Sequence, residues 1–406
     1  MAINFDEIID RRGTNALNTD GFRGYIFHAG PEMVFPYKDE EFVRMWVADM
    51  EFGVAPEIID AIRARLDRRI FGYTGVYDSN YYDSFRKWCL DHYDWDFPQE
   101  QLCFTPGIIP ALYQLGELLC TKAEKVLLNT PAYGYFLHAA EYSGLGVLHS
   151  PLLKNEKGEF SLDYEDFEAK CADPHCKLVF WCNPHNPSGR IWTEEELLRI
   201  AEIVMKYNLW IISDEIHCDL LRTGQKHTPM AKVMPEYPKL ITCMAPTKTF
   251  NMAGLAFSNI IIRDAELREK FKERDKLFGM VNPLSLAAAK AAYDYGDPWL
   301  QELRAYLDEN FAFVKEFLSE YLPEAVMNIP SATYLAWVNM GPCLPDVKDL
   351  PDFFAHNAGV LLEGGDDLFV GNAAGYVRLN LAMPRSIIRT GLERMRDAIR
   401  AHNDGK

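Results

Sequence analysis

Short apolar runs bounded by turn residues recur along the first two thirds of the chain. They lie at residues 125–129, 146–149, 178–182, 209–213, 240–244 and 259–262. Each run has the length of a strand, and continuous apolar runs of that length are typical of strands buried on both faces.

Helical patterns lie between these runs, most clearly at residues 193–207. Thr193 can cap the first turn, and Glu196 completes the S/T-x-x-E capping box. The apolar face of this segment comprises Leu197, Ile200, Ile203 and Val204. Alternating strands and helices predict an α/β fold with a mostly parallel sheet covered on both sides.

The pattern changes after about residue 285, where long helical stretches at 284–295 and 299–321 precede strand-like runs at 332–339 and 377–381. This change predicts a second domain of α+β type. Residues 1–46 carry few periodic signals and are expected to pack on that second domain. We therefore expect an N-terminal segment at 1–46, a large domain at 47–287 and a small domain at 288–406.

Length and charge narrow the class of protein. A chain of 406 residues is long enough for two domains with a sizeable core. Its formal net charge of -17 repels polyanions, so nucleic acid is not an expected partner. The start lacks a secretory signal, and the longest apolar runs are far shorter than the ~20 residues of a membrane helix, so we expect no membrane association.

Nine cysteines are scattered through apolar runs. Their odd number and their spread do not suggest a disulfide framework, which favours reduced thiols and a cytoplasmic location. We expect no metal site.

The densest group of chemically useful residues lies between Asn183 and Gly254. It consists of NPHNPSG at 183–189, SDEIH at 213–217 and APTKTFNMAG at 245–254. Each segment follows a predicted strand, and ligands of parallel α/β sheets sit at the carboxyl ends of strands. All three segments are expected to face one crevice.

Asp214 and Lys248 together suggest a particular cofactor. Pyridoxal phosphate needs a lysine amine to hold it as a Schiff base and a carboxylate to keep its ring nitrogen protonated. Taken singly, Asp214 reads as a strand-end acid and Lys248 as a solvated loop lysine. Their order and their flanking residues favour the cofactor site.

The set N-P-x-N-P-S-G, D-E and T-K resembles the fold-type I pyridoxal enzymes of the aspartate aminotransferase superfamily, over most of the chain. The chain looks most like the MalY/PatB branch of cystathionine β-lyases. That likeness is carried by WVADMEF at 46–52, FGYTG at 71–75, TPGIIPAL at 105–112, APTKTFNMAGL at 245–255 and VRLNLAMPR at 377–385. The resemblance implies a PLP-dependent transferase-like fold, with a mostly parallel seven-stranded sheet in the large domain and a smaller α+β domain.

By this resemblance Lys248 anchors the cofactor and acts as the catalytic base, and Asp214 holds the ring nitrogen. Asn186 would bind the 3'-oxygen beside the substrate, although it also reads as a turn residue next to Pro187. Tyr133 would stack on the ring; without the family it reads as a core aromatic. His217 stands where aminotransferases carry a tyrosine to the 3'-oxygen, and a buried structural histidine is the other interpretation.

The phosphate is expected at the start of a helix. Gly107 permits a tight turn, after which the amides of Ile108 and Ile109 can bind an anion, although a plain strand-to-helix turn is also possible. Relatives often carry an arginine for the phosphate, but Ala256 stands at that place. The substitutes implied are Thr247 and a tyrosine, Tyr73, from the neighbouring subunit.

Arg378 matches the residue that clamps the substrate α-carboxylate, a task suited to a guanidinium fork. It also reads as a strand-end surface arginine, although its apolar neighbours indicate burial. Ala48 falls where a small residue lets its backbone amide approach the same carboxylate. Arg385, after Pro384, is a further candidate for this task, although a structural role is the expected one.

The resemblance implies a carbon–sulfur β-lyase that converts a sulfur-containing amino acid to pyruvate, ammonia and a thiol, and that works as a homodimer with shared active sites. Two alternatives stay open. An aminotransferase would use every residue named above, and a regulatory protein could retain the cofactor for binding alone.

Overall fold

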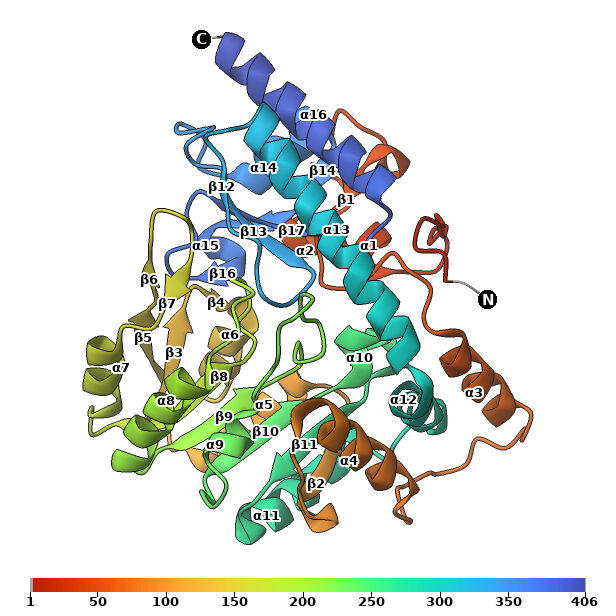
Figure 1. Ribbon diagram of the computed structural model, residues 1–406, viewed down its shortest axis with the longest axis vertical. Helices are drawn as coiled ribbons and strands as arrows, with labels where there is room; N and C mark the ends of the chain where they lie inside the picture. Colours follow the sequence, from red (N-terminus) through yellow and green to blue (C-terminus); the bar gives the residue numbers. More distant parts are fainter. Residues whose placement is uncertain (1–2, 406) are drawn as a thin grey trace.

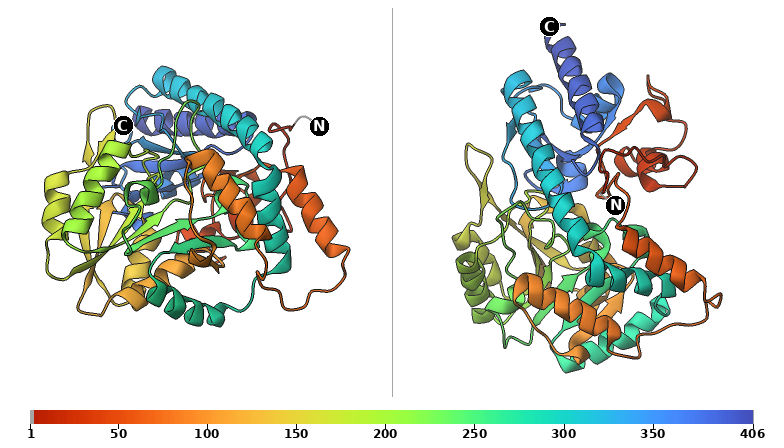
Figure 2. Two further views of the ribbon diagram at one scale, coloured as in Figure 1. Left: turned by 60° about the horizontal axis from the view of Figure 1, so that its bottom comes forward. Right: turned by 45° about the vertical axis from the view of Figure 1, so that its right-hand side comes forward.

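The computed structural model describes residues 3–405, except the side chains at positions 278, 366 and 367. Two bodies of unequal size lie one above the other (Figure 1). The lower body contains the large sheet, and the upper one contains the C-terminal helices together with part of the N-terminal segment (Figures 1 and 2).

The large sheet has seven strands in the order β2-β11-β10-β9-β8-β3-β5. These are β2 (Leu102–Thr105), β3 (Lys125–Thr130), β5 (Gly146–Pro151), β8 (Cys176–Cys182), β9 (Trp210–Asp214), β10 (Leu240–Met244) and β11 (Ser258–Ile262). Only β11 runs antiparallel to its neighbours, so the predicted mostly parallel sheet is confirmed. All six predicted strands form. The seventh, β2, has only four residues, too few to give a periodic signal.

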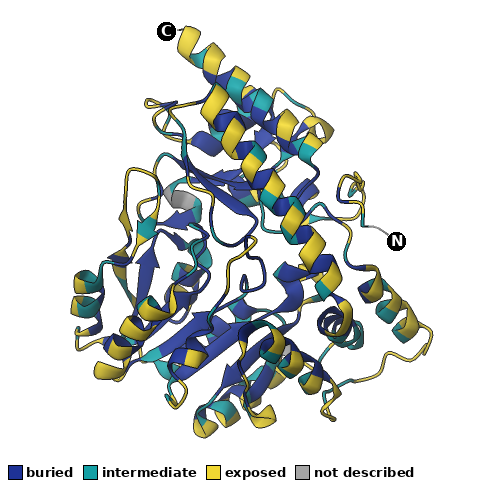
Figure 3. Ribbon diagram, viewed as in Figure 1, coloured by how far each residue is buried: buried dark blue, intermediate teal, exposed yellow. Residues whose placement is uncertain are grey.

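The inner strands are largely apolar and buried because both faces of the sheet are covered, whereas the edge strand β5 is partly exposed (Figure 3). In β8, Leu178 and Phe180 pack into the cluster beneath α5 (Ile108–Leu119), α6 (Gly134–Tyr142) and α11 (Ala265–Asp275). Val179 and Trp181 point the opposite way, into the core with α4 (Asn80–Tyr93), α8 (Glu194–Lys206) and α12 (Pro283–Tyr295). Successive side chains of a strand alternate between faces, which divides one apolar run between two cores.

Helix α8 begins as the sequence predicts. The Thr193 hydroxyl accepts from the Glu196 amide at 3.2 Å, and the Glu196 carboxylate accepts from the Thr193 amide at 2.9 Å. This capping box satisfies the free donors of the first turn and fixes where the chain leaves the loop after β8.

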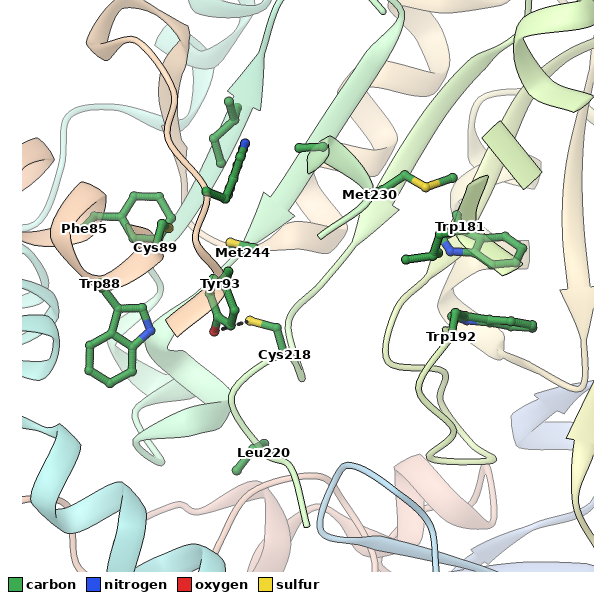
Figure 4. Close-up of a cluster of buried hydrophobic side chains, with 14 of the residues drawn as sticks. Phe85, Trp88, Cys89, Tyr93, Trp181, Trp192, Cys218, Leu220, Met230 and Met244 are labelled. Atoms are coloured by element: carbon green, nitrogen blue, oxygen red, sulfur yellow. Dashed lines mark hydrogen bonds between the residues drawn. The ribbon is translucent and has the colours of Figure 1, made fainter. Parts of the chain in front are cut away.

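A buried cluster holds the segment that follows β9 (Figure 4). The Tyr93 hydroxyl of α4 donates to the Cys218 sulfur at 3.1 Å. Asp219 accepts from the Trp88 indole at 3.0 Å and from the Thr249 hydroxyl at 2.7 Å. These bonds tie the segment after Asp214 to the turn that carries Lys248.

The upper body is built on a four-stranded sheet in the order β12-β13-β17-β15. Its strands are β12 (Val326–Met327), β13 (Leu335–Asn339), β15 (Glu363–Gly364) and β17 (Tyr376–Asn380), and its helices are α13 (Asp297–Tyr321), α14 (Leu350–Ala358) and α16 (Arg385–Asp404). Strand β13 begins three residues later than Ala332, the predicted start. Ala332 instead forms a bridge with Leu221 of the lower body, so tertiary contact takes these residues out of the sheet.

The N-terminal segment packs against the upper body (Figure 2, right). Strand β1 (Val43–Arg44) pairs in parallel with β14 (Val360–Leu361), and Trp46 shares an apolar cluster with Leu361. These contacts support the three-part division at 1–46, 47–287 and 288–406, which stays our proposal.

The remaining elements are short or lie at the edges of the two bodies. They are α1 (Leu17–Asp20), α2 (Phe22–Ile26), α3 (Pro56–Leu66), β4 (Ala132–Tyr133), β6 (Leu153–Lys154), β7 (Phe160–Ser161), α7 (Tyr164–Cys171), α9 (Met230–Val233), α10 (Pro246–Thr249), α15 (Gly365–Leu368) and β16 (Phe369–Val370), with 3-10 turns at Asp39–Glu41, Gln99–Gln101, Ala253–Leu255 and Lys276–Phe278. Among the residues described, no helix combines the length and apolar character needed to cross a membrane.

Candidate active site

The three polar segments meet at the carboxyl edge of the large sheet, as the sequence predicts. Cys182 at the end of β8 pairs with Asp214 at the end of β9, and Cys243 of β10 pairs with Asp214 from the other side. The loop after Cys182, the end of β9 and the turn α10 therefore lie next to one another.

Lys248 lies on α10 and reaches across to the N-terminal segment. Its Nζ donates to the Ala48 carbonyl oxygen at 2.6 Å. Burial, together with the nearby charge of Arg378, lowers the pKa of Lys248 to about 8. A substantial part of this amine is therefore neutral near pH 8, as nucleophilic attack or proton abstraction requires.

Asp214 ends β9 with only 7% of its surface exposed. Its carboxylate accepts from the Ile216 amide at 3.1 Å. Burial raises the pKa of Asp214 to about 7, since that one amide and the more distant Lys248 stabilise the charged form only in part. A cationic ring nitrogen at this carboxylate would restore its charged form.

The neighbouring acid, Glu215, is fully engaged elsewhere. It lies 2.7 Å from the His227 imidazole, and it accepts from the Ser213 hydroxyl at 2.8 Å and the Met230 amide at 3.0 Å. Of the two adjacent acids, Asp214 is thus the one left for a ligand.

Arg378 and Asn186 come together although 192 positions separate them. Arg378 is 2% exposed on β17, and its Nη1 donates to the Asn186 side-chain oxygen at 3.3 Å. Its Nη2 pairs with Glu363, the residue opposite it on β15. Sequence reasoning missed Glu363, whose only signal was a single acid inside the apolar run VLLEG.

His217 is 3% exposed, and within residues 3–405 its Nδ1 has no hydrogen-bond partner. Burial, with the charges of Lys248 and Arg378, lowers the pKa of His217 to about 3. The ring is therefore neutral, and a buried ring nitrogen without a partner suits a polar ligand atom.

Tyr133 lies in β4, which pairs with β16 of the upper body. Burial raises its pKa, and Tyr25 from α2 is a hydrogen-bond partner. Tyr25 was not foreseen, since nothing in the sequence of the N-terminal segment indicates that α2 reaches the site.

The segment that carries Ala48 is held by neighbouring side chains. The Ala48 carbonyl also accepts from the Tyr334 hydroxyl at 2.9 Å. The Asn380 amide donates to the carbonyls of Val47 at 2.8 Å and Asp49 at 2.5 Å. Ala48 is thereby fixed beside Lys248.

The expected anion site lies at the start of α5. Gly107 precedes the first turn, in which Ile108 and Ile109 are the first two helical residues. Thr247 is buried on α10, whereas Ala256 is exposed with φ of +49°. A helix N-terminus with free backbone amides suits a phosphate. Position 256 is an alanine and supplies no positive charge to it.

Two other predicted residues lie apart from this group. Tyr73 is 96% exposed in the segment between α3 and α4, which lies at the outer edge of the lower body (Figure 1). Arg385, at the start of α16, donates to Glu309 and Asn310 of α13, which supports a structural role.

A seven-stranded α/β sheet with a lysine, a carboxylate and an arginine converging at its carboxyl edge defines a class. The chain belongs to the aminotransferase class I and II family, whose sequence pattern matches residues 41–394. This confirms the family to which the motifs pointed, and its fold.

Comparison with individual relatives shows which members of the family this chain resembles. The chain is 36% identical over 401 residues to the cystathionine beta-lyase PatB of Bacillus subtilis (strain 168), covering 98% of this chain and 100% of that protein. It is 31% identical to the protein MalY of Escherichia coli (strain K12), covering 98% and 99% of the two chains. Among solved structures, the PLP-bound C-S lyase from Staphylococcus hominis matches with a TM-score of 0.93, 44% identity and 98% coverage of each chain.

Proposed function

We propose that this chain is a pyridoxal 5'-phosphate-dependent carbon–sulfur β-lyase that acts on a sulfur-containing amino acid of the cystathionine type. With one water, the substrate gives pyruvate, ammonia and a thiol. The observation that carries the proposal is the buried group of Lys248, Asp214 and Arg378 at one sheet edge. Whole-length likeness to PatB and to a PLP-bound C-S lyase supports it.

The residues of the site suit the ring of the cofactor and its phosphate. Asp214 is a buried carboxylate that needs a cation, and His217 has an unpartnered Nδ1 among the residues described. Asn186 and Tyr133 would hold the 3'-oxygen and the ring face. The amides of Ile108 and Ile109, with the Thr247 hydroxyl, would hold the phosphate. When bound, the cofactor supplies an electron sink for the substrate α-carbon.

Three side chains of the site have separate roles in the proposed reaction. Arg378 binds the substrate α-carboxylate, with the backbone of Ala48 beside it, and so orients the Cα–H bond toward Lys248. The Lys248 amine removes that proton, for which its lowered pKa is suited. Asp214 would keep the ring nitrogen protonated, which favours loss of the thiolate from the β-carbon.

An aminotransferase would use the same side chains, and the family includes that activity. The two functions separate in one experiment. Purified protein with pyridoxal phosphate and L-cystathionine should release pyruvate although no 2-oxo acid is added as amino-group acceptor. Amino transfer that depends on an added 2-oxo acid, with no pyruvate from cystathionine alone, would overturn the lyase proposal.

We further propose that the working unit is a homodimer with shared active sites. Large apolar side chains near Tyr73 are exposed in the single chain, and such patches are typical of interfaces. They are Leu66, Ile70, Phe71, Tyr77, Leu277 and Met280. Tyr73 of the partner subunit would then complete the phosphate site that lacks an arginine.

The cytoplasm is the proposed location. All nine cysteines are free thiols in the part of the chain that is described, which suits a reducing compartment.

A further inference from the structure

A cavity of about 250 Å³ opens beside the active site. Its walls come from α2, from β4 with the start of α6, and from β15. The residues that matter are Tyr25, His28, Tyr133, Tyr135, His138 and Glu363. Tyr133 and Glu363 belong to the active site as well, so the cavity and the site share a wall.

Arg378 fixes where a substrate would meet this cavity. Its guanidinium pairs with Glu363, which lines the cavity, and also bonds Asn186 on the cofactor side. A substrate whose α-carboxylate is held by Arg378 therefore lies at the cavity, with room there for the part of its side chain beyond sulfur.

Charge in this wall is unbalanced once a substrate binds. Arg378 carries one positive charge, but it would face two negative ones, Glu363 and the α-carboxylate. Lys248 is the other cation whose charge acts on Glu363, and it must be neutral to accept a proton. Glu363 is 2% exposed, and a buried carboxylate left without a countercharge is costly.

We propose that this cavity binds the leaving portion of the substrate and that Glu363 makes it select a departing thiol that carries an ammonium group. The inference rests on the proposed lyase function. When Arg378 binds the α-carboxylate, Glu363 loses part of its countercharge. An ammonium group at the far end of the substrate would supply that positive charge to Glu363. The hydroxyls and imidazoles around it supply donors for a carboxylate carried beside the ammonium, as in L-cystathionine.

Two substrates of nearly equal shape test the proposal in the holoenzyme. S-(2-aminoethyl)-L-cysteine ends in an ammonium group, and S-propyl-L-cysteine ends in a methyl group. We expect kcat/KM for pyruvate release to favour the amino substrate by about tenfold or more. Glu363→Gln should bring the ratio close to one, while Glu363→Asp, which keeps the charge, should retain a preference.

Both substrates present the same α-carboxylate to Arg378, and the ammonium makes its own thiolate a better leaving group to the same extent in every variant. The change of the ratio on Glu363→Gln therefore isolates the contact with the distal group. Glu196→Gln is the matched control: it also removes a carboxylate that pairs with an arginine, Arg190, but it lies outside the cavity, and it should leave the ratio unchanged. Pyruvate from both substrates without preference, or a ratio that Glu363→Gln does not alter, overturns the subsite alone. Pyruvate from L-cystathionine but from neither test substrate also overturns the subsite, whereas no pyruvate from any of the three removes the lyase function and the subsite with it. If the Gln variant does not fold, Glu363→Asp replaces it: a preference smaller than in the unmodified protein supports the subsite, and an unchanged preference overturns it.

Discussion

Burial shifts Lys248 and Asp214 toward their neutral forms from opposite directions. The pKa of Lys248 falls to about 8 and that of Asp214 rises to about 7, because loss of water disfavours the charged form of each. The pKa of each group therefore lies close to physiological pH, so that both its protonated and its deprotonated forms are populated there. An acid and a base placed in this way suit proton transfer between substrate and protein.

The lowered pKa of Lys248 predicts how cofactor loading depends on pH. Only the neutral amine attacks an aldehyde, and it dominates above about pH 8. When pyridoxal phosphate is added to cofactor-free protein, the rate of colour formation should rise about tenfold per pH unit below that value and level off above it. Stopped-flow absorbance measures the rate, and the Lys248→Ala variant identifies the absorbance change that requires this lysine. A rate that levels off only near pH 10.5 would mean that the amine is solvated like an ordinary lysine.

Asp214→Asn tests the buried carboxylate. A neutral amide of the same shape cannot hold a ring nitrogen in its charged form, so turnover should fall about 100-fold or more while the cofactor stays bound. Pyruvate release gives the activity, and the absorption spectrum gives the bound cofactor. Turnover close to normal would show that Asp214 does not face the ring.

At the level of elements, the capping box of α8 predicts a modest stability effect. Thr193→Ala removes the hydroxyl that accepts from the Glu196 amide, which should cost about 1 kcal/mol. In a chain of this size we expect the melting temperature to fall by about 2 °C. Thr193→Ser keeps the acceptor and is the control. An equal loss in both variants would assign the effect to the missing methyl group.

Strand β17 supports the site through Asn380, whose amide donates to the carbonyls of Val47 and Asp49 on either side of Ala48. Asn380→Ala leaves these carbonyls without that donor and should loosen the segment. We expect KM for the amino acid to rise by about tenfold while cofactor binding changes little. Asn357→Ala removes a similar bond within α14, away from the site, and should leave KM unchanged. If both variants behave alike, Asn380 does not position Ala48.

For the whole molecule, the shared-site proposal predicts complementation between inactive variants. Tyr73→Phe and Lys248→Ala should each be nearly inactive as pure dimers. In a mixed dimer one site would keep its own Lys248 and Tyr73 of the partner subunit, so activity should return to about a quarter of normal in an equal mixture. Pyruvate release after mixing measures this. If hybrids form but no activity returns, Tyr73 does not serve the neighbouring site.

The sequence by itself determined six of the seven strands of the large sheet and the polar segments along its carboxyl edge. Strands buried on both faces are read as continuous apolar runs, and each polar segment of the site directly follows such a run. Asp214 and Lys248 are predictable because their positions depend on strand ends, which local sequence fixes. The capping box of Thr193 is predictable for the same reason.

The sequence pointed to Arg378, but tertiary structure alone decided that Tyr25 and Glu363 lie beside it. These residues come from α2, β15 and β17, and the packing of the N-terminal segment and the upper body on the sheet brings them together. Such contacts depend on how separate elements fold against each other, and no local pattern encodes that. The same reason explains why Ala332 leaves its predicted strand to pair with Leu221.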